Sequence, residues 1–355
     1  MEAESSPQVT SAAHENGVDR FSPAPPEDPH FRPESATWVL SRYEQVLAAL
    51  REPGLWPTGP LNSEPSPLSD PTEQLRVRAA ASEAFSAAKV AQWQAQIEPL
   101  ARTRMNHLER DRHVDLIREF ARPWSLDAAT TVTGVDTISR ELLADLARQV
   151  SAAAAEPNDA ALQSEAAVAN AELETILQGS MPMRASVFVA LSQGLPCFLA
   201  SAWLALLQNP LELERLRLQP TLMPGAIEEL LRYAGLARSL FRRATKDVTL
   251  GPVTIAEGHR VMLMLDSANR DPAQFAEPNR LDLGRRVAGQ LAFGAGPHSC
   301  VGALLIRMAA AVATNAFVQN VAGREIIGPI EWRGGSGFRW PASLNVRVQS
   351  HRSAG

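Results

Sequence analysis

The residues best placed to do chemistry in this chain are a cysteine and the glycines around it. Residues 293–302 read FGAGPHSCVG and lead directly into the apolar run ALLIRM. The N-terminus of the helix predicted there carries a partial positive charge, which favours the ionised thiolate of Cys300. Gly294 and Gly296 let the backbone approach a flat ligand closely, and Gly302 allows tight packing after the cysteine. The pattern therefore predicts a thiolate that faces a metal.

This string resembles the heme-binding loop of the cytochrome P450 family, F-G-x-G-x-H-x-C-x-G, and matches all six fixed positions. The resemblance implies that Cys300 is the axial ligand of heme b (iron protoporphyrin IX) and that Phe293, Gly294, His298 and Gly302 contact the cofactor. A thiolate ligand pushes electron density onto heme iron and favours O–O cleavage. A buried structural cysteine is the commoner fate of a lone Cys, but six matched positions argue against it. The implied fold is mostly α with a small β region, with heme between a long distal helix and the helix after the cysteine loop.

The resemblance also implies partners for the heme propionates. Besides His298, Arg242 in the segment RRATKDV matches the family's R-x-A-T-x-D pattern. Arg78 matches the arginine of an H-x-x-x-R helix, and Gln74 stands in place of the histidine of that motif. The alternative for Arg78 is a solvated position beside Arg76.

A second constellation is the helical pair Glu229 and Arg232. Residues three apart lie on one helix face and can form an ion pair. Such pairs are common on solvated helices, but this one lies about seventy residues before Cys300, as does the family's buried E-x-x-R. The resemblance adds Arg280, from the segment FAEPNR, as a third member. We expect the three to form a buried structural triad that holds the cysteine loop, because a buried charge without its partner is costly.

Residues 183–208 predict one long apolar helix, which the resemblance places over the distal face of the heme. The family carries an acid followed by an alcohol there, in A-G-x-[DE]-T, and these relay protons during O–O cleavage. Here the motif reads ALSQG, so that Gln193 replaces the acid and Gly194 the alcohol. If the alignment slips by one residue, Ser192 supplies the alcohol, but no acid lies nearby. We assign these three as candidate catalytic residues, expect a kink at Pro196, and predict that the usual relay is missing.

The resemblance further implies a substrate pocket. Apolar residues at helical spacing are more often core, and Arg238 is the exception that could meet a polar or anionic group. Short connections around the pocket suggest an open site for a large or carrier-bound substrate. The expected lining is Phe188, Leu191, Leu195, Leu236, Arg238, Leu240 and Phe338.

The composition of the chain limits its partners and the compartment in which it is expected. The chain has 355 residues, 45% of them hydrophobic, and a net charge of −5, which favours neither nucleic acid nor an anionic membrane as a partner. Two cysteines exclude a disulfide framework and fit the cytoplasm. No anchor or signal pattern is evident, so the chain resembles the soluble bacterial type. We expect residues 1–32 to be a disordered tail and residues 33–355 to form a single heme-thiolate domain.

Local patterns predict the order of the elements. A strand is expected at 36–40, a helix at 43–51, a loop over 52–71 and a helix from 72. Further helical stretches are expected over 88–122, over 138–180 with an interruption at Pro157-Asn158, and over 183–208 and 224–234. Strands are expected over 248–265, and a hairpin in the last 30 residues.

Four functions remain open at this point. The first is a monooxygenase that tailors a bacterial specialised metabolite, with electrons from a ferredoxin and non-standard oxygen activation. The second is a peroxide-dependent peroxygenase, and the third a non-oxygenating enzyme of cyclisation, dehydration or rearrangement. The fourth is a catalytically idle heme-binding protein. Residues 84–90 read AFSAAKV where the family often has A-F-x-P-R-R-V, and fewer positive charges predict weaker docking of an acidic ferredoxin.

Overall fold

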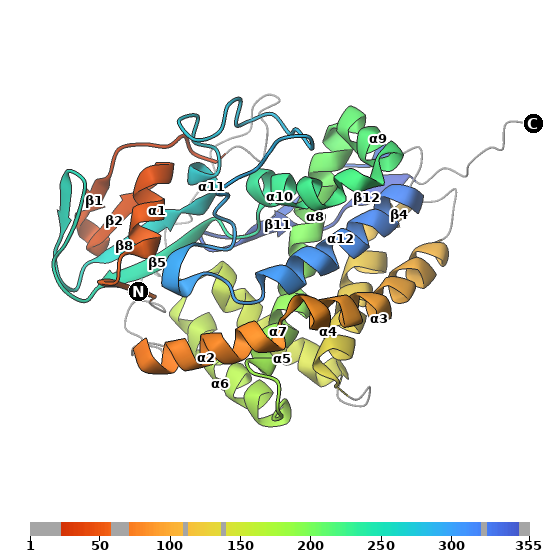
Figure 1. Cartoon of the computed structure of the whole chain (residues 1–355), viewed down its shortest axis with the longest axis horizontal. Coiled ribbons are helices and arrows are strands. Elements are labelled where there is room, and N and C mark those ends of the chain that lie inside the picture. Colours follow the sequence, from red (N-terminus) through yellow and green to blue (C-terminus); the bar gives the residue numbers. More distant parts are fainter. Residues whose placement is uncertain (1–22, 58–70, 109–112, 136–139, 321–324, 348–355) are drawn as a thin grey trace, which may run out of the picture.

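The computed structural model describes residues 23–57, 71–108, 113–135, 140–320 and 325–347. Helices form most of the body, and a small β region lies at one end beside α1 (Figure 1). The helices are α1 (Tyr43–Arg51), α2 (Pro71–Ala84), α3 (Ala87–Asn106), α4 (Arg122–Thr133), α5 (Arg140–Ala155), α6 (Ala160–Ile176), α7 (Arg184–Val189), α8 (Leu195–Gln208), α9 (Pro210–Leu218), α10 (Met223–Ala234), α11 (Leu265–Ala268) and α12 (Ala303–Asn320).

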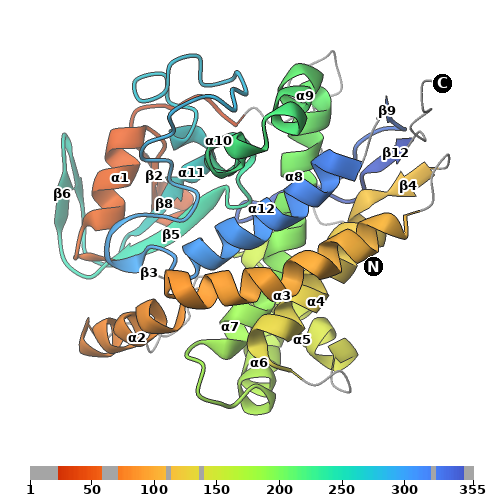
Figure 2. The same cartoon turned by 45° about the vertical axis from the view of Figure 1, so that its right-hand side comes forward.

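The centre of the helical body is α8. Almost all of its side chains are buried, and it packs against α9, α10 and α12. Helix α12 crosses between α8 and α3 (Figure 2). Aromatic rings fill the space between the helices: Trp203 stacks on Phe317 with ring centroids 4.8 Å apart and lies 5.7 Å from Phe120. A helix that is apolar all round belongs in a protein core, and here α9, α10 and α12 pack around it.

The long distal helix predicted from the sequence is present as one continuous helical run from Arg184 to Gln208. It is long and apolar enough to cross a membrane, but most of it is buried inside the protein, as in the core helix of a soluble fold. Between α7 and α8 the run widens into a π-helical turn, Ala190–Gly194. Pro196 lacks the N–H that an α-helix needs, so the irregularity expected at this proline takes the form of a π turn just before it.

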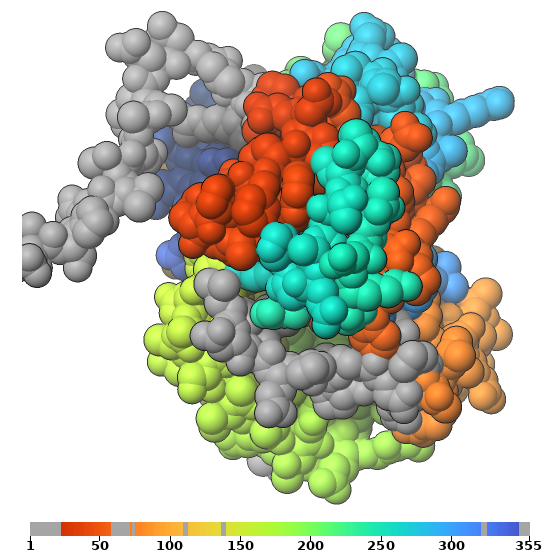
Figure 3. All heavy atoms as spheres, turned by 90° about the vertical axis from the view of Figure 1, so that its left-hand side faces the viewer, coloured from red at the N-terminus to blue at the C-terminus, as the bar shows by residue number. Residues whose placement is uncertain are grey.

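The main sheet has five strands in the order β1-β2-β8-β5-β3. Strand β2 pairs with β8 in parallel, and the other neighbours are antiparallel. Helix α1 covers the sheet and shares a second apolar core with it, which includes Leu40, Val46, Leu50, Val261 and Leu263. Seen from this end of the molecule, the sheet and α1 lie above the yellow-green segment that contains α6 (Figure 3). The strands are β1 (His30–Arg32), β2 (Thr37–Leu40), β8 (Arg260–Met264), β5 (Ser239–Ala244) and β3 (Leu55–Pro57).

The remaining strands are short. A hairpin joins β6 (Val248–Leu250) to β7 (Val253–Ile255), and another joins β10 (Trp332–Gly334) to β11 (Arg339–Pro341). A three-stranded sheet has the order β4-β12-β9 and pairs segments far apart in the sequence. Its strands are β4 (His113–Asp115), β12 (Asn345–Arg347) and β9 (Glu325–Ile326).

Several sequence expectations need correction. Of the tail expected to be disordered, residues 1–22 lie outside the described part, but His30–Arg32 form strand β1, because their backbone pairs with β2. The helix expected over 88–122 is wrong, since β4 interrupts it and pairs with β12. The loop expected over 52–71 contains β3, which pairs with β5. In the C-terminal region β10 and β11 form a hairpin, but the last strand, β12, joins β4 and β9 instead.

Candidate active site

The loop that carries Cys300 is held in a tight conformation by its own backbone. The Cys300 N–H donates to the carbonyl of Phe293 over 2.9 Å, and the residues between them turn through a short 3₁₀ segment, Gly296–His298. Gly294 and Gly296 have φ angles of +67° and +70°, a region that other residues rarely adopt. A Cβ atom at Gly296 would lie 2.7 Å from the carbonyl oxygen of Leu50. The loop therefore needs its glycines for both conformation and space.

The side chain of Cys300 opens onto a cavity of about 470 Å³. Burial raises the pKa of the thiol, while the Gly302 N–H and the positive charges of Arg307 and Arg78 act in the opposite direction. A bound metal ion would favour the thiolate, because metals bind the deprotonated thiol.

The cavity is mostly apolar and is built from α5, α6, α7, α8, β5 and the cysteine loop. Of the pocket residues expected from the sequence, Leu195, Leu236, Leu240 and Phe338 line it, together with Gly194. Its lining also contains residues that the sequence did not indicate, among them Val150, Ser151, Ala154, Asn170, Ser186, Val189, Ala190 and Phe198.

Two expected pocket residues lie elsewhere. Phe188 and Leu191 are fully buried in the helical core. The reason is helix phase: Ser186, Ala190 and Gly194, spaced by four, face the cavity, so Phe188 and Leu191 face the core. That spacing of small residues was the signal in the sequence that could have identified the cavity face.

The candidate catalytic residues are not gathered at the cavity. Ser192 is buried, and its hydroxyl has no hydrogen-bond partner. Gln193 donates from Nε2 to the carbonyl of Ala144 on α5 over 3.4 Å. Only Gly194 lines the cavity, and it has no side chain to transfer a proton. The assignment of Ser192 and Gln193 to the reaction centre therefore needs correction, since the turn directs both side chains elsewhere.

A cluster of positive charge surrounds His298. Arg242 is buried, its Nε has no hydrogen-bond partner among the described residues, and its Nη1 donates to the carbonyl of Phe241 over 2.9 Å. Burial lowers the pKa of Arg242 to about 10. Burial, followed by the charges of Arg242 and Arg78, lowers the pKa of His298 to about 4. A buried cation with an unused donor beside a second cation fits a ligand that brings anionic groups, such as the propionates of heme.

Arg78 also contacts the cysteine loop directly. Its guanidinium donates to the carbonyl of Ser299 over 2.8 Å and to the Ser299 hydroxyl over 3.1 Å. It is therefore a support for the residue before the ligand rather than a solvated neighbour of Arg76. Gln74 lies on α2, and its side chain is outside the described part of the structure.

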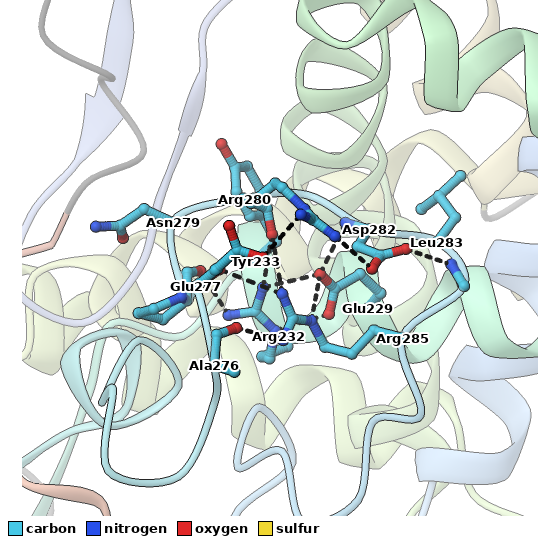
Figure 4. A network of polar contacts seen from close by, with 12 residues as sticks. Glu229, Arg232, Tyr233, Ala276, Glu277, Asn279, Arg280, Asp282, Leu283 and Arg285 are labelled. Carbon is cyan, nitrogen blue, oxygen red and sulfur yellow. Dashed lines mark hydrogen bonds and ion pairs between the residues drawn. The ribbon is translucent and has the colours of Figure 1, made fainter.

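The pair of Glu229 and Arg232 forms the centre of a buried network (Figure 4). Two bonds of 2.7 and 2.8 Å join the guanidinium to the carboxylate, and both side chains are fully buried. Arg232 also donates to the carbonyls of Asn269 and Pro278. Its hydrogen-bonding capacity is largely satisfied, as a buried charge requires.

The third member of this cluster is Arg285 and not the expected Arg280. The Nε of Arg285 lies 3.2 Å from Glu229, and only 14% of the Arg285 side chain is exposed. The Arg280 side chain is 57% exposed and pairs with Glu277 and Asp282, and only its carbonyl oxygen meets Arg232, at 3.4 Å. Figure 4 shows the Arg280 side chain turned toward Asp282. The turn at residues 277–282 brings the later arginine, not the earlier one, to the carboxylate.

The residue before this cluster, Glu228, makes a contact that the sequence analysis missed. It forms an ion pair with Arg307 on α12 and accepts a bond from Gln290 over 3.1 Å. The guanidinium of Arg307 lies 4.8 Å from the ring centroid of Phe293. The neighbouring glutamates of α10 therefore bind the chain on both sides of the cysteine loop: Glu229 pairs with Arg285 before it, and Glu228 pairs with Arg307 after it.

Arg238 does not line the cavity described here. It pairs with Asp266 over 3.1 Å and donates to the carbonyl of Gly335. Burial raises the pKa of Asp266, and Arg238 opposes that shift. The expectation that Arg238 meets the substrate is wrong in this structure, because its charge is already committed.

Comparison with known proteins supports what the loop indicates. The family model "Cytochrome P450" matches residues 216–322. Cytochrome P450 107B1 of Saccharopolyspora erythraea is 31% identical over 339 residues, which cover 80% of this chain and 81% of that protein. This chain belongs to the cytochrome P450 family. It is a heme-binding oxidoreductase of the monooxygenase class, and Cys300 and Arg242 fit the iron and the propionates of its cofactor.

Other members share the fold and much of the length. Mycinamicin VIII C21 methyl hydroxylase of Micromonospora griseorubida is 31% identical over 314 residues, covering 77% of this chain and 80% of that protein. Its crystal structure with mycinamicin VIII superposes with a TM-score of 0.79 and 26% identity over 90% of this chain and 92% of that one. P450BioI in complex with an acyl carrier protein has the same fold, with a TM-score of 0.79 and 24% identity over 88% of this chain and 91% of that one.

Proposed function

We propose that this cytochrome P450 is a cytoplasmic monooxygenase that tailors a specialised metabolite, with electrons delivered by a ferredoxin. The observation that carries the proposal is the position of Cys300, whose sulfur opens onto a mostly apolar cavity large enough for a small molecule. Relatives support the substrate class, since one is a mycinamicin hydroxylase and another is a 20-oxo-5-O-mycaminosyltylactone 23-monooxygenase of Streptomyces fradiae.

The chain's own residues bind and orient. Heme held by the Cys300 thiolate supplies the oxygen-activating chemistry. Arg242 and His298 would hold the propionates of the cofactor. Leu195 and Phe198 present apolar surface from α8, which excludes water and leaves a hydrocarbon substrate to be oriented by shape.

Proton supply is the unusual part of this site. Along the distal helix from residue 189 to 198, the residues that line the cavity are Val189, Ala190, Gly194, Leu195 and Phe198. None of these side chains can transfer a proton. Because Gln193 is engaged with α5, we propose that protons reach the site through water or through the substrate. This proposal retains the non-standard oxygen activation predicted from the sequence.

The same observation favours a second candidate, a peroxide-dependent enzyme. Hydrogen peroxide brings its own protons and electrons, so a distal helix without a proton relay hinders that route less. The weakly basic segment at residues 84–90, with Lys89 its single cation, agrees with a reduced need for ferredoxin docking.

One experiment separates the two candidates. The heme-loaded protein is supplied either with a surrogate ferredoxin, its reductase and isotopically labelled dioxygen, or with hydrogen peroxide alone. The substrates are decan-1-ol as an apolar probe and the products of neighbouring biosynthetic genes, and products are identified by mass spectrometry. Labelled oxygen in a product supports the monooxygenase, and product from peroxide alone supports the second candidate. Absence of oxygenated product in both arms overturns both and leaves a non-oxygenating or idle heme protein.

A further inference from the structure

We propose that the cavity contains a head-group subsite, formed by Ser151, Asn170 and Ser186, that selects a largely apolar substrate with a neutral hydroxyl group. The inference rests on the proposed function only in that the same cavity holds the substrate. It names a recognition element that lies away from the thiolate. The hydroxyl would bind at this subsite while a distant carbon approaches the heme.

The three residues line the cavity from helices that pack against one another. Ser186, Ala190 and Gly194 line it at intervals of four residues along the distal helix. Eight residues of helix rise about 12 Å, so Ser186 lies roughly that distance from Gly194. Ser151 and Asn170 come from α5 and α6, which both pack on α7. All three helices lie on the same side of α12 (Figure 2).

The two serine hydroxyls are available for a ligand. Serine and threonine within a helix commonly donate to the carbonyl one turn back, and Thr130, Thr133 and Thr175 do so here. Within the described part of the chain, no such bond engages the hydroxyl of Ser151 or Ser186. Both residues line the cavity instead.

The hydrogen-bonding groups of Asn170 limit which substrate head group can bind beside it. Its Nδ2 donates to a carboxylate oxygen of Glu174 over 3.0 Å. The carbonyl oxygen Oδ1 accepts hydrogen bonds, and the second N–H of Nδ2 can still donate one. A hydroxyl group, which both donates and accepts, therefore suits this position, whereas a carboxylate would be brought toward the acceptor Oδ1 and toward the charge of Glu174.

The rest of the lining excludes a charged head group. None of the described residues that line the cavity is Asp, Glu, Lys or Arg, and the two titratable ones, His298 and Cys300, belong to the heme-binding loop. Arg238, which could have met an anion, is paired with Asp266. Burying an ion without a partner is costly, whereas a hydrogen-bonded hydroxyl is tolerated. The apolar wall formed by Val150, Ala154 and Val189 suits hydrocarbon.

The test compares three probes of equal chain length on the heme-loaded full chain. Binding of decan-1-ol, decyl methyl ether and decanoate is measured by equilibrium dialysis, with the optical shift of the heme as a second reading. A neutral hydrogen bond is equivalent to about a three- to tenfold change in Kd. We therefore expect decan-1-ol to bind about three- to tenfold more tightly than the ether, and decanoate to bind more weakly than either. Decanoate binding as tightly as the alcohol, or the ether equalling it, overturns the proposal.

Variants assign the effect to the subsite. Ser151→Ala combined with Ser186→Ala should reduce the preference for the alcohol over the ether, whereas Ser164→Ala, an exposed serine on α6, should leave it unchanged. Asn170→Lys should make decanoate the tightest of the three probes. A preference that survives undiminished in the double serine variant and in Asn170→Lys contradicts the assignment. The readout is binding, so a protein that ranks the probes as expected but forms no oxygenated product refutes the proposed function and not this subsite.

Discussion

The Nε of Arg285 lies 3.2 Å from a carboxylate oxygen of Glu229. This bond joins α10 to the segment that runs on toward the cysteine loop. The same guanidinium donates to the carbonyls of Ala276 and Glu277, at 2.6 and 3.2 Å. Arg285 therefore closes the turn and fastens it to a buried carboxylate at the same time, which sets the path of the chain toward Cys300.

The first prediction follows from this contact. Arg285→Ala should lower the free energy of unfolding by about 1–3 kcal/mol, because hydrogen bonds to a buried charge are lost. Heme content after purification should fall with it. Arg280→Ala, five residues away, should leave stability close to that of the unmodified protein, since its side chain and its ion pair with Glu277 are exposed. Thermal or denaturant unfolding of both variants measures the difference, and equal losses would show that Arg280 belongs to the cluster after all.

A second prediction concerns the pair at the centre of the network. Glu229→Ala or Arg232→Ala should cost roughly 3–5 kcal/mol, because each leaves an uncompensated buried charge, and should give little soluble, heme-loaded protein. The chain offers a matched control in Glu214 and Arg217, which have the same three-residue spacing but are 51% and 36% exposed. Glu214→Ala should cost under about 1 kcal/mol. A wild-type melting temperature of the Glu229 variant would mean that this pair, like Glu214 and Arg217, adds little to stability.

The sequence predicted those parts of the fold that depend on local pattern. Helix α1 was expected at residues 43–51 and lies at Tyr43–Arg51, because its apolar spacing and the Pro-Gly after it are local features. Strand β4 was missed, since its partner β12 lies more than two hundred residues later. No local pattern encodes a pairing of that range.

The candidate site likewise has parts that the local sequence predicts and parts that depend on the three-dimensional structure. The cysteine loop could be recognised because glycine positions and ligand are fixed within ten residues of sequence. The phase of the distal helix was harder to predict: the small residues Ser186, Ala190 and Gly194 mark its cavity face, but a π turn at Ala190–Gly194 rotates the residues after it relative to an α-helix. The choice between Arg280 and Arg285 depended on the shape of a turn, and both arginines suit the carboxylate chemically.

The third prediction tests the ligand. Reduced protein with carbon monoxide should show the absorption band that marks thiolate ligation, and Cys300→Ala should abolish it. The control is the other cysteine of the chain, Cys197, whose pKa is raised to about 12 by burial within α8. Cys197→Ala should keep the band. If the band persists without Cys300, the thiolate assignment fails.

The fourth prediction addresses the missing proton relay. Gly194 faces the cavity, and a Cβ added there would lie at an ordinary 3.8 Å from Leu236. Gly194→Ser or Gly194→Thr should therefore place a hydroxyl in the cavity without a clash and raise the product formed per electron on a generic substrate. Gly194→Ala controls for the added volume and should give no gain.

Gln193→Glu should not help in the same assay. Its side chain is directed to the carbonyl of Ala144 on α5, so the change sets a carboxylate against another acceptor and loses a hydrogen bond, at a cost of about 1–3 kcal/mol. Product per electron, measured with a surrogate ferredoxin system, compares this variant with Gly194→Thr and with the double variant. We expect the gain to follow residue 194 alone. A gain that requires the glutamate would show that residue 193 turns toward the heme when the cofactor is bound. Tight coupling in the unmodified enzyme on generic substrates would place the relay on another residue.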